Sequence, residues 1–219
     1  MSEALFEVPL FPLNVVLFPG MALPLHIFEL RYRQMVADCL ADRAPFGIAL
    51  ALPESVHEPE TPAPVGTLAR IADYEELPDG RYNLLALGTR RFAIVEKRHE
   101  RRYLTGLVRP LCDDGSEPET ECVQSARTAL YTYLRLVLKL VGSEHRQIEV
   151  PTEPEELSYL IGICLTCEDG EKQRLLEVTS VGERLRQGVA LLHKETEALQ
   201  QQSPGDHVTA NPVDRLWLN

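Results

Sequence analysis

The stretch FPLNVVLFPGMALPLHIF, residues 11–28, decides how the first half of this sequence folds. It is mostly apolar, contains three prolines and has no Lys, Arg, Asp or Glu. The first basic residue of the chain is Arg31, so the cationic region that opens a secretory signal is missing. The prolines and Gly20 interrupt a run that is already too short to cross a bilayer as a helix. We therefore interpret the stretch as part of a folded domain and predict a cytoplasmic protein without a membrane segment.

Strand signals lie at both ends of this stretch. The segments LFEVPLF, residues 5–11, and MALPLHI, residues 21–27, are typical of strands, and they are joined by a loop around Asn14. Their prolines restrict them to sheet edges or strand ends. A helix is expected from about Phe28, because apolar side chains then recur with the spacing of one helical face. The members of this stripe are Tyr32, Met35, Val36, Cys39 and Leu40.

Further strands are predicted up to residue 111. They are PFGIALAL (45–52), VGTLARIADYEEL (65–77), RYNLLALGTRRFAIVEK (81–97) and RYLTGLVRPL (102–111). Pro78-Asp79-Gly80 has the composition of a tight turn, so the second and third of these segments form a long hairpin. Five or six strands around one helix predict a small, partly closed barrel.

The pattern changes to helical near residue 113. DDGSEPETE, residues 113–121, carries five acids and no bases, and is typical of a solvated linker that begins a helix. A long apolar stripe then follows at helical spacing. Its members are Val123, Ala126, Leu130, Leu134, Val137, Leu138 and Val141. Three capping boxes are predicted to open helices: Ser116 with Glu119, Thr152 with Glu155, and Ser180 with Glu183.

These patterns predict an α+β fold with three segments. Residues 1–115 form a β-rich barrel with one embedded helix, residues 116–202 form a C-terminal α-helical bundle, and residues 203–219 form a tail.

Composition and charge narrow the function. The 219 residues are 44% hydrophobic and 25% charged, as in ordinary globular proteins, and the formal net charge is −11. Nucleic acids and anionic lipid surfaces are polyanions, so this charge disfavours both as general partners.

Sequence motifs for catalysis, metals and cofactors are missing. The six histidines form no HExxH, and no Gly-Lys dipeptide is present for a phosphate-binding loop. Cys164 and Cys167 form a CxxC, but they follow an apolar helical segment, where the helix dipole disfavours the thiolate that redox chemistry needs. Zinc would require a second pair at ligand spacing, which Cys112 and Cys122 do not supply. We predict five reduced thiols, no metal, no cofactor and no enzymatic activity; a redox function of the CxxC is the less favoured alternative.

A basic run, TRRFAIVEKRHERR, covers residues 89–102. It gathers Arg90, Arg91, Lys97, Arg98, Arg101 and Arg102. The run fits the solvent face of two strands, on which basic side chains discourage edge pairing. The alternative is a nucleic-acid contact on the barrel.

Three segments together resemble a known family. FPLNVVLFPGMALPLHIFELRY, PVGTLARI and LPDGRYNLLALGTRRFAIVE look like the N-terminal, substrate-binding domain of Lon ATP-dependent protease. EKQRLLEVTSVGERLRQGVALL resembles the helical part that follows it, so the resemblance spans roughly residues 5–200. The same domain occurs in cereblon and in stand-alone bacterial proteins of about this size, of which this chain looks like one.

The resemblance implies a PUA-like pseudo-barrel followed by a helical bundle. It implies contact with unfolded or tagged proteins and peptides, and a contribution to assembly, while separate ATPase and protease modules do the chemistry. This chain ends before either module would begin, so we expect a non-catalytic protein-binding module that acts with a protease or another partner protein. Self-association is a further expectation. Gly20, Gly66, Gly80 and Gly88 align with family glycines, and we expect turns and close backbone approaches there.

The candidate peptide-binding surface lies in the opening loop and the strand and helix after it. Its members are Leu17, Phe18, Met21, His26, Phe28 and Tyr32. Exposed apolar patches usually mark interaction sites, and an extended peptide can also pair with an open strand edge. The alternative is that these side chains plug the barrel. A PUA-like barrel also permits RNA binding, which the net charge disfavours.

Overall fold

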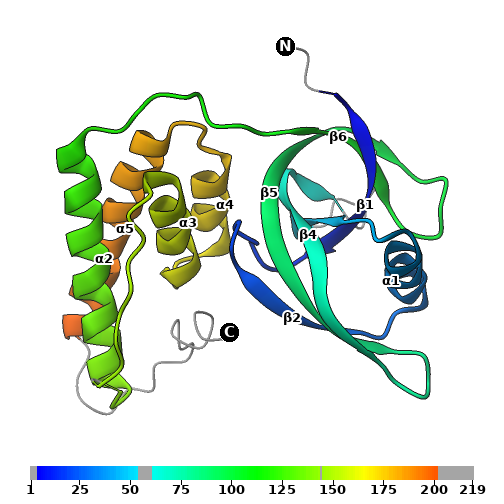
Figure 1. Ribbon diagram of the computed structural model, residues 1–219, viewed down its shortest axis with the longest axis horizontal. Helices are drawn as coiled ribbons and strands as arrows, with labels where there is room; N and C mark the ends of the chain where they lie inside the picture. Colours follow the sequence, from blue (N-terminus) through cyan, green and yellow to red (C-terminus); the bar gives the residue numbers. More distant parts are fainter. Residues whose placement is uncertain (1–3, 54–60, 144, 202–219) are drawn as a thin grey trace. The chain divides into compact units, whose positions relative to one another are not determined.

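The computed structural model describes residues 4–53, 61–143 and 145–201. It is the predicted mixed α+β fold, with a six-stranded sheet and five helices in the described residues (Figure 1). The chain divides into two compact units between Cys112 and Asp113. The predicted tail, residues 203–219, lies outside the described residues.

The first unit is a barrel. Its strands are β1 (Phe6–Leu13), β2 (Ala22–Ile27), β3 (Phe46–Ala51), β4 (Pro62–Glu76), β5 (Tyr82–Arg98) and β6 (Thr105–Pro110). They are ordered β2-β5-β4-β3-β1-β6, and an additional pairing of β5 with β6 closes five of them into a ring. The remaining strand, β2, pairs with β5 alone and is therefore an edge strand among the described residues. The predicted strands and partial closure are confirmed; the PUA-like class stays a prediction.

One helix packs against the barrel. Helix α1 (Leu30–Asp42) lies between β2 and β3 in the chain and buries Tyr32, Met35, Val36 and Cys39, which confirms the predicted stripe. Leu40 is half-buried. The helix ends at Asp42, and the next residue, Arg43, adopts a left-handed conformation with φ of 50°. The connection from β1 to β3 runs through β2 and α1, and it allows β1 and β3 to pair in parallel. The other strand pairs are antiparallel.

The opening loop is fixed to the barrel through its backbone. The Thr67 hydroxyl donates to the Leu17 carbonyl at 2.6 Å inside the unit. The Gly20 amide donates to the Gly88 carbonyl, and the Gly88 amide donates to the Met21 carbonyl, both at 2.9 Å. A Cβ at Gly88 would collide with the Phe18 carbonyl oxygen. The predicted close approach at Gly88 is therefore confirmed.

The β4–β5 hairpin turns where the sequence predicts. The Gly80 amide donates to the Leu77 carbonyl at 2.8 Å, and Gly80 has a φ of 76°, which favours glycine. Asp79 stabilises the turn by accepting the Arg81 amide hydrogen at 3.1 Å.

The second unit is helical. Its helices are α2 (Thr120–Leu140), α3 (Pro154–Cys164), α4 (Asp169–Glu177) and α5 (Val181–Gln201), and α5 packs against α2 and α3. Of the three predicted capping boxes, only the one at Ser180 forms a cap, where the Glu183 amide donates to the Ser180 hydroxyl at 3.4 Å.

The capping boxes predicted at Ser116 and Thr152 are wrong. Helices α2 and α3 begin after Glu119 and Glu153, and neither has a side-chain cap. The Ser116 amide and hydroxyl instead donate to Asp114, because an aspartate two residues upstream offers a tighter local turn.

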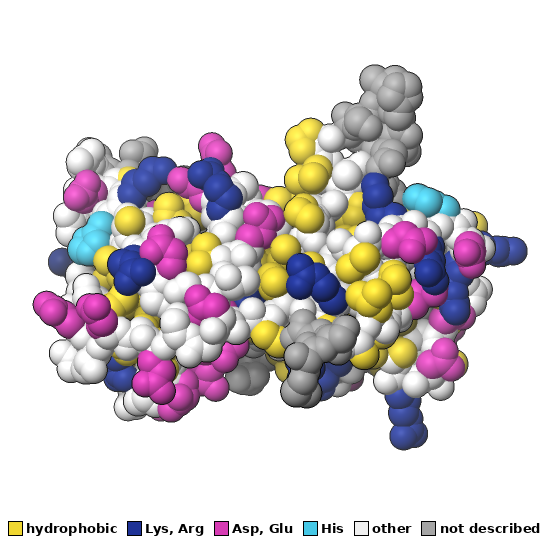
Figure 2. Space-filling view, turned by 90° about the horizontal axis from the view of Figure 1, so that it is seen from above, with side chains coloured by type: hydrophobic (Ala, Val, Ile, Leu, Met, Phe, Trp, Pro, Cys, Tyr) yellow, Lys and Arg dark blue, Asp and Glu magenta, His cyan; other side chains and the backbone are white. Residues whose placement is uncertain are grey.

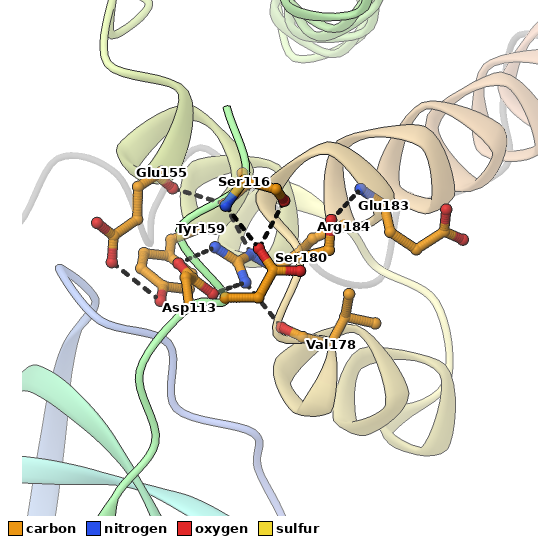
Figure 3. A network of polar contacts seen from close by, with 10 residues as sticks. Asp113, Ser116, Glu155, Tyr159, Val178, Ser180, Glu183 and Arg184 are labelled. Carbon is orange, nitrogen blue, oxygen red and sulfur yellow. Dashed lines mark hydrogen bonds and ion pairs between the residues drawn. The ribbon is translucent and has the colours of Figure 1, made fainter. Parts of the chain in front are cut away.

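A buried guanidinium organises the second unit (Figure 3). The Arg184 side chain is 0% exposed, and it donates to both Asp113 carboxylate oxygens, at 2.8 and 3.0 Å. It also donates to the Ser158 hydroxyl and the Val178 carbonyl, each at 2.8 Å. The guanidinium carbon lies 4.5 Å from the centre of the Tyr159 ring. Helices α3 and α5 and the segment before α2 are thereby joined through one charge.

A second polar cluster fixes the loop after α3. One Glu195 oxygen accepts the amide hydrogens of Thr166 and Cys167, at 2.8 and 2.7 Å. The other accepts the Thr166 and Tyr133 hydroxyls, at 2.9 and 2.7 Å. Desolvation raises the pKa of Tyr133, and the nearby Glu195 carboxylate raises it further. Tyr133 therefore acts as a neutral donor at neutral pH.

Candidate functional site

The six residues predicted to bind peptide separate into two groups. Leu17, Phe18, Met21 and Tyr32 are buried in the barrel unit and present almost no surface to a ligand. This burial corresponds to the alternative prediction, in which the side chains plug the barrel; the opening loop supplies three of them, and α1 supplies Tyr32. His26 and Phe28 are exposed, and Phe28 is 63% exposed. Their role in binding stays a prediction.

The exposed pair borders an apolar surface at the end of β2. The rings of His26 and Phe28 stack with their centres 6.3 Å apart, and Leu30, at the start of α1, is 78% exposed. Figure 2 shows one face of the molecule, on which hydrophobic side chains lie exposed between charged ones in the barrel unit. Neighbouring exposed apolar side chains of this kind are typical of contact surfaces.

A groove of ≈ 510 Å³ lies across β2, β5 and β4. Ligand sites in proteins typically have volumes of roughly 300–1,000 Å³, so the groove is large enough to hold part of a peptide. Its lining residues are Pro24, Leu25, His26, Asp73, Tyr74, Glu75, Asn83, Leu84 and Leu85. We call it the β2–β4 groove. Of these residues only His26 was among the predicted site residues. The members from β4 and β5 were missed because only the strand register brings them beside β2.

Two rows of side chains line the outer side of the groove. Pro24, Leu85 and Asp73 are direct cross-strand neighbours, and so are His26, Asn83 and Glu75. Directly paired side chains of antiparallel strands lie on the same face. Asn83 and Leu85 alternate with buried residues along β5, so this face points away from the barrel interior.

A chain of hydrogen bonds crosses the second row. The Arg81 guanidinium can only donate, so His26 Nε2 accepts from it at 3.3 Å. His26 Nδ1–H then donates to Oδ1 of the Asn83 side chain at 2.7 Å. The Asn83 amide group in turn donates to Glu75 at 3.4 Å. The bonds from His26 to Asn83 and from Asn83 to Glu75 run from β2 across β5 to β4, so they orient the Asn83 side chain and support the Glu75 carboxylate.

The β2 backbone offers further hydrogen-bonding groups. The Gly88 amide bonds to the Met21 carbonyl, which sets the alternation of bonded and non-bonded pairs along β2 and β5. By that alternation the backbone groups of Ala22, Pro24 and His26 point away from β5. Proline has no N–H, so Pro24 at such a position costs the ladder no hydrogen bond. An extended segment can therefore pair with this edge.

The basic run does not form a continuous cationic surface. Arg91 is buried, Arg98 pairs with Glu7 at 3.0 Å and with Glu96 at 3.4 Å, and Arg101 lies 3.6 Å from Asp38. The carboxylates therefore neutralise much of the charge that nucleic acid would need.

The CxxC thiols are held protonated. Cys164 is the last residue of α3 and is buried, and burial raises the pKa of its thiol to about 12. Burial likewise raises the pKa of Cys167 to about 11, with a contribution from the Glu195 carboxylate. The five cysteines form no disulfide, and the predicted position of Cys164 at the end of a helix is confirmed.

Alkylation of the native protein should report these pKa values. At pH 7.5 we expect iodoacetamide to modify exposed Cys112 about a hundredfold faster or more than Cys164 and Cys167, because only the thiolate reacts. Peptide mass spectrometry over a time course measures the three rates, and the urea-unfolded chain is the control, in which they should converge. Equal native rates for Cys167 and Cys112 would contradict the protonated pair and revive a redox role.

Metal clusters and membrane-crossing helices are absent from the part of the chain that the structure describes. In residues 4–53, 61–143 and 145–201, no three His, Cys, Asp or Glu side chains are grouped so that they could hold a metal ion. In the same ranges no helix has the length and apolar character that a membrane crossing needs.

Comparisons with a family model and with known proteins identify the same family. Residues 7–194 match the model of the ATP-dependent protease La (LON) substrate-binding domain. Lon protease 1 of Hydrogenovibrio crunogenus is 28% identical over 214 residues, which cover 94% of this chain and 26% of that protein. Lon protease of Xanthomonas oryzae is 32% identical over 203 residues, covering 89% of this chain and 24% of that protein. The chain thus spans about a quarter of the length of these relatives.

Solved structures support the same fold. A Lon N-terminal domain protein from Xanthomonas campestris aligns with a TM-score of 0.65 and 28% identity, covering 84% of this chain and 98% of that one. The N-terminal domain of Mycobacterium avium complex Lon protease aligns with a TM-score of 0.64 at 20% identity, covering 86% and 98%.

Proposed function

We propose that this chain, which belongs to the family of the ATP-dependent protease La (LON) substrate-binding domain, binds unfolded or tagged polypeptides and catalyses no reaction itself. The observation that carries the proposal is the exposed apolar surface of Phe28 and Leu30 beside the β2–β4 groove and the β2 edge. The family supplies the class of partner, and the surface supplies the means of contact.

Three kinds of contact are available to a polypeptide at this site. Apolar side chains can cover Phe28 and Leu30, which removes apolar surface from water. An extended backbone can pair with the outward groups of β2. The groove adds a concave surface that combines apolar and polar side chains, which suits segments of varied composition. None of these contacts reads one particular sequence, so the proposal is for weak, broad recognition.

The proposal assigns no proteolysis to this chain. The family match covers the substrate-binding domain, and the share of each Lon relative that aligns is about a quarter. We propose that the chain delivers or holds polypeptides for a separate protease or another partner protein.

Binding of an unfolded protein tests the function. We expect reduced and carboxyamidomethylated α-lactalbumin, which stays unfolded in native buffer, to bind with a Kd on the order of micromolar or above. Phe28→Ala should weaken binding about three- to tenfold, because truncating an exposed aromatic anchor removes apolar contact. Isothermal titration or fluorescence anisotropy measures the Kd.

Tyr131→Ala is the matched control. Tyr131 is an aromatic side chain 49% exposed on α2, and its loss should leave the Kd unchanged. Absence of binding at the highest attainable protein concentration would refute the proposal. Equal losses of affinity in the Phe28→Ala and Tyr131→Ala variants would show that the polypeptide does not contact the end of β2.

A further inference from the structure

We propose that the β2–β4 groove selects polypeptide segments in which a lysine or arginine stands close to an apolar residue. This inference rests on the proposed function and adds a chemical preference to it. The occupant is an extended segment that lies across the outer face of β2, β5 and β4, with the cationic side chain at Asp73 and Glu75.

The charge of the groove is one-sided. Its lining contains Asp73 and Glu75 but neither lysine nor arginine. The nearest bases lie at the periphery. Arg81 pairs with Asp79 at 2.7 Å while it donates to His26, and Arg70 lies one row along the sheet, opposite Leu87. A cation in the groove therefore meets two carboxylates without displacing a lining base.

Neutral donors hold both carboxylates in place. The Tyr74 amide donates to one Asp73 oxygen at 2.9 Å, and the Asn83 side chain donates to one Glu75 oxygen at 3.4 Å. In the described part of the chain neither carboxylate forms an ion pair. The negative charges are thus positioned but not neutralised, which is what a site for a cation requires.

Apolar surface lies within reach of these charges. Leu85 is the direct neighbour of Asp73, and Pro24 is the next residue in the same row, on β2. Strands are spaced about 4.8 Å apart, so the apolar side chains lie about 5–10 Å from the carboxylate. An extended chain advances about 3.3 Å per residue, so positions i and i+2 on one face match this spacing.

The geometry also separates this mode from simple edge pairing. A strand added to β2 would lie three strand spacings, about 14 Å, from β4. A lysine side chain does not bridge that distance. Preference for a cation therefore reports a segment on the face of the sheet, whereas edge pairing alone would be indifferent to charge.

Three labelled peptides test the inference. They share the sequence Ser-Val-Thr-X-Ser-Val-Thr-X-Ser-Val, with X as lysine, glutamine or glutamate. Fluorescence anisotropy with the 219-residue chain should give a Kd about tenfold lower for the lysine peptide than for the glutamate peptide, because each exposed charge pair changes affinity severalfold at most. The difference should shrink in 0.5 M NaCl. The glutamine peptide should fall between them.

A charge-neutralised groove is the critical variant. The preference for lysine is the Kd of the glutamate peptide divided by the Kd of the lysine peptide. In the double variant Asp73→Asn with Glu75→Gln this ratio should fall to about a third or less of its wild-type value, while the Kd of the glutamine peptide stays unchanged. Asp42→Asn with Glu100→Gln is the control. It removes the same charge from exposed positions outside the groove lining, and so corrects for the net charge of −11.

Each outcome is decisive. Equal affinities for the lysine and glutamate peptides would overturn the inference, and so would an equal loss in the control variant, which would mean that overall charge alone attracts the peptide. In either case the proposed function survives if unfolded α-lactalbumin binds. Failure of both the peptides and the unfolded protein to bind would instead remove the function on which the inference rests. Unchanged thermal unfolding of both variants establishes that they are folded.

Discussion

Arg184→Ala should lower the free energy of unfolding of the helical unit by about 3–5 kcal/mol, because it leaves the Asp113 carboxylate without its buried partner. Arg184 is buried and Asp113 is only 14% exposed, so water compensates poorly for the lost pair. The Ser158 hydroxyl and the Val178 carbonyl lose a donor at the same time. Urea denaturation followed by circular dichroism at 222 nm measures the change.

Two further variants make the result specific. Arg186→Ala, two positions along α5, removes a 60% exposed arginine whose pair with Glu183 is on the surface, and should change stability little. Arg184→Met keeps an unbranched apolar stem but removes the guanidinium and its charge, and should remain destabilised while Asp113 is present. A wild-type midpoint for Arg184→Ala would show that the buried pair does not hold the unit together.

Phe18→Ala should destabilise the barrel unit by about 3–5 kcal/mol, the usual cost of removing a buried phenylalanine. Phe18 is fully buried, and its own carbonyl oxygen packs against Gly88, which restricts the loop from collapsing into the cavity. Thermal or urea unfolding of the 219-residue chain measures the effect.

Phe28→Ala is the matched control for this prediction. The two phenylalanines were predicted to share one role, yet the second is largely exposed and should change stability by no more than about 0.5 kcal/mol. We expect Phe18→Ala to affect stability and Phe28→Ala to affect binding. The reverse pattern, with a stable Phe18→Ala that binds weakly, would show that the opening loop opens to bring Phe18 to a ligand.

The barrel was predictable from local patterns. Strand composition and proline placement located β1 and β2, a single apolar stripe located α1, and Pro78-Asp79-Gly80 located the hairpin. These signals are short-range: each depends on the few residues that form the element. The helices of the second unit followed from the same periodicity, although two of their three predicted caps were wrong. The donors of Ser116 bond to Asp114, and α3 begins after Glu153 without a side-chain cap.

The site was less predictable. Phe18 and Phe28 carry the same side chain, so the sequence alone does not tell that the first is buried and the second is exposed. The groove combines residues 24–26, 73–75 and 83–85, and only the register of β2, β5 and β4 makes them neighbours. Arg184 likewise has its partner Asp113 from 71 positions away.

The amino-acid sequence by itself determined the elements, the acidic character and the change from strands to helices near residue 113, because periodicity and turn chemistry act over a few residues. The tertiary structure alone decided which apolar side chains remain on the surface and which charges meet. Burial and cross-strand pairing depend on contacts between segments far apart in the chain, and a local sequence pattern does not predict such contacts.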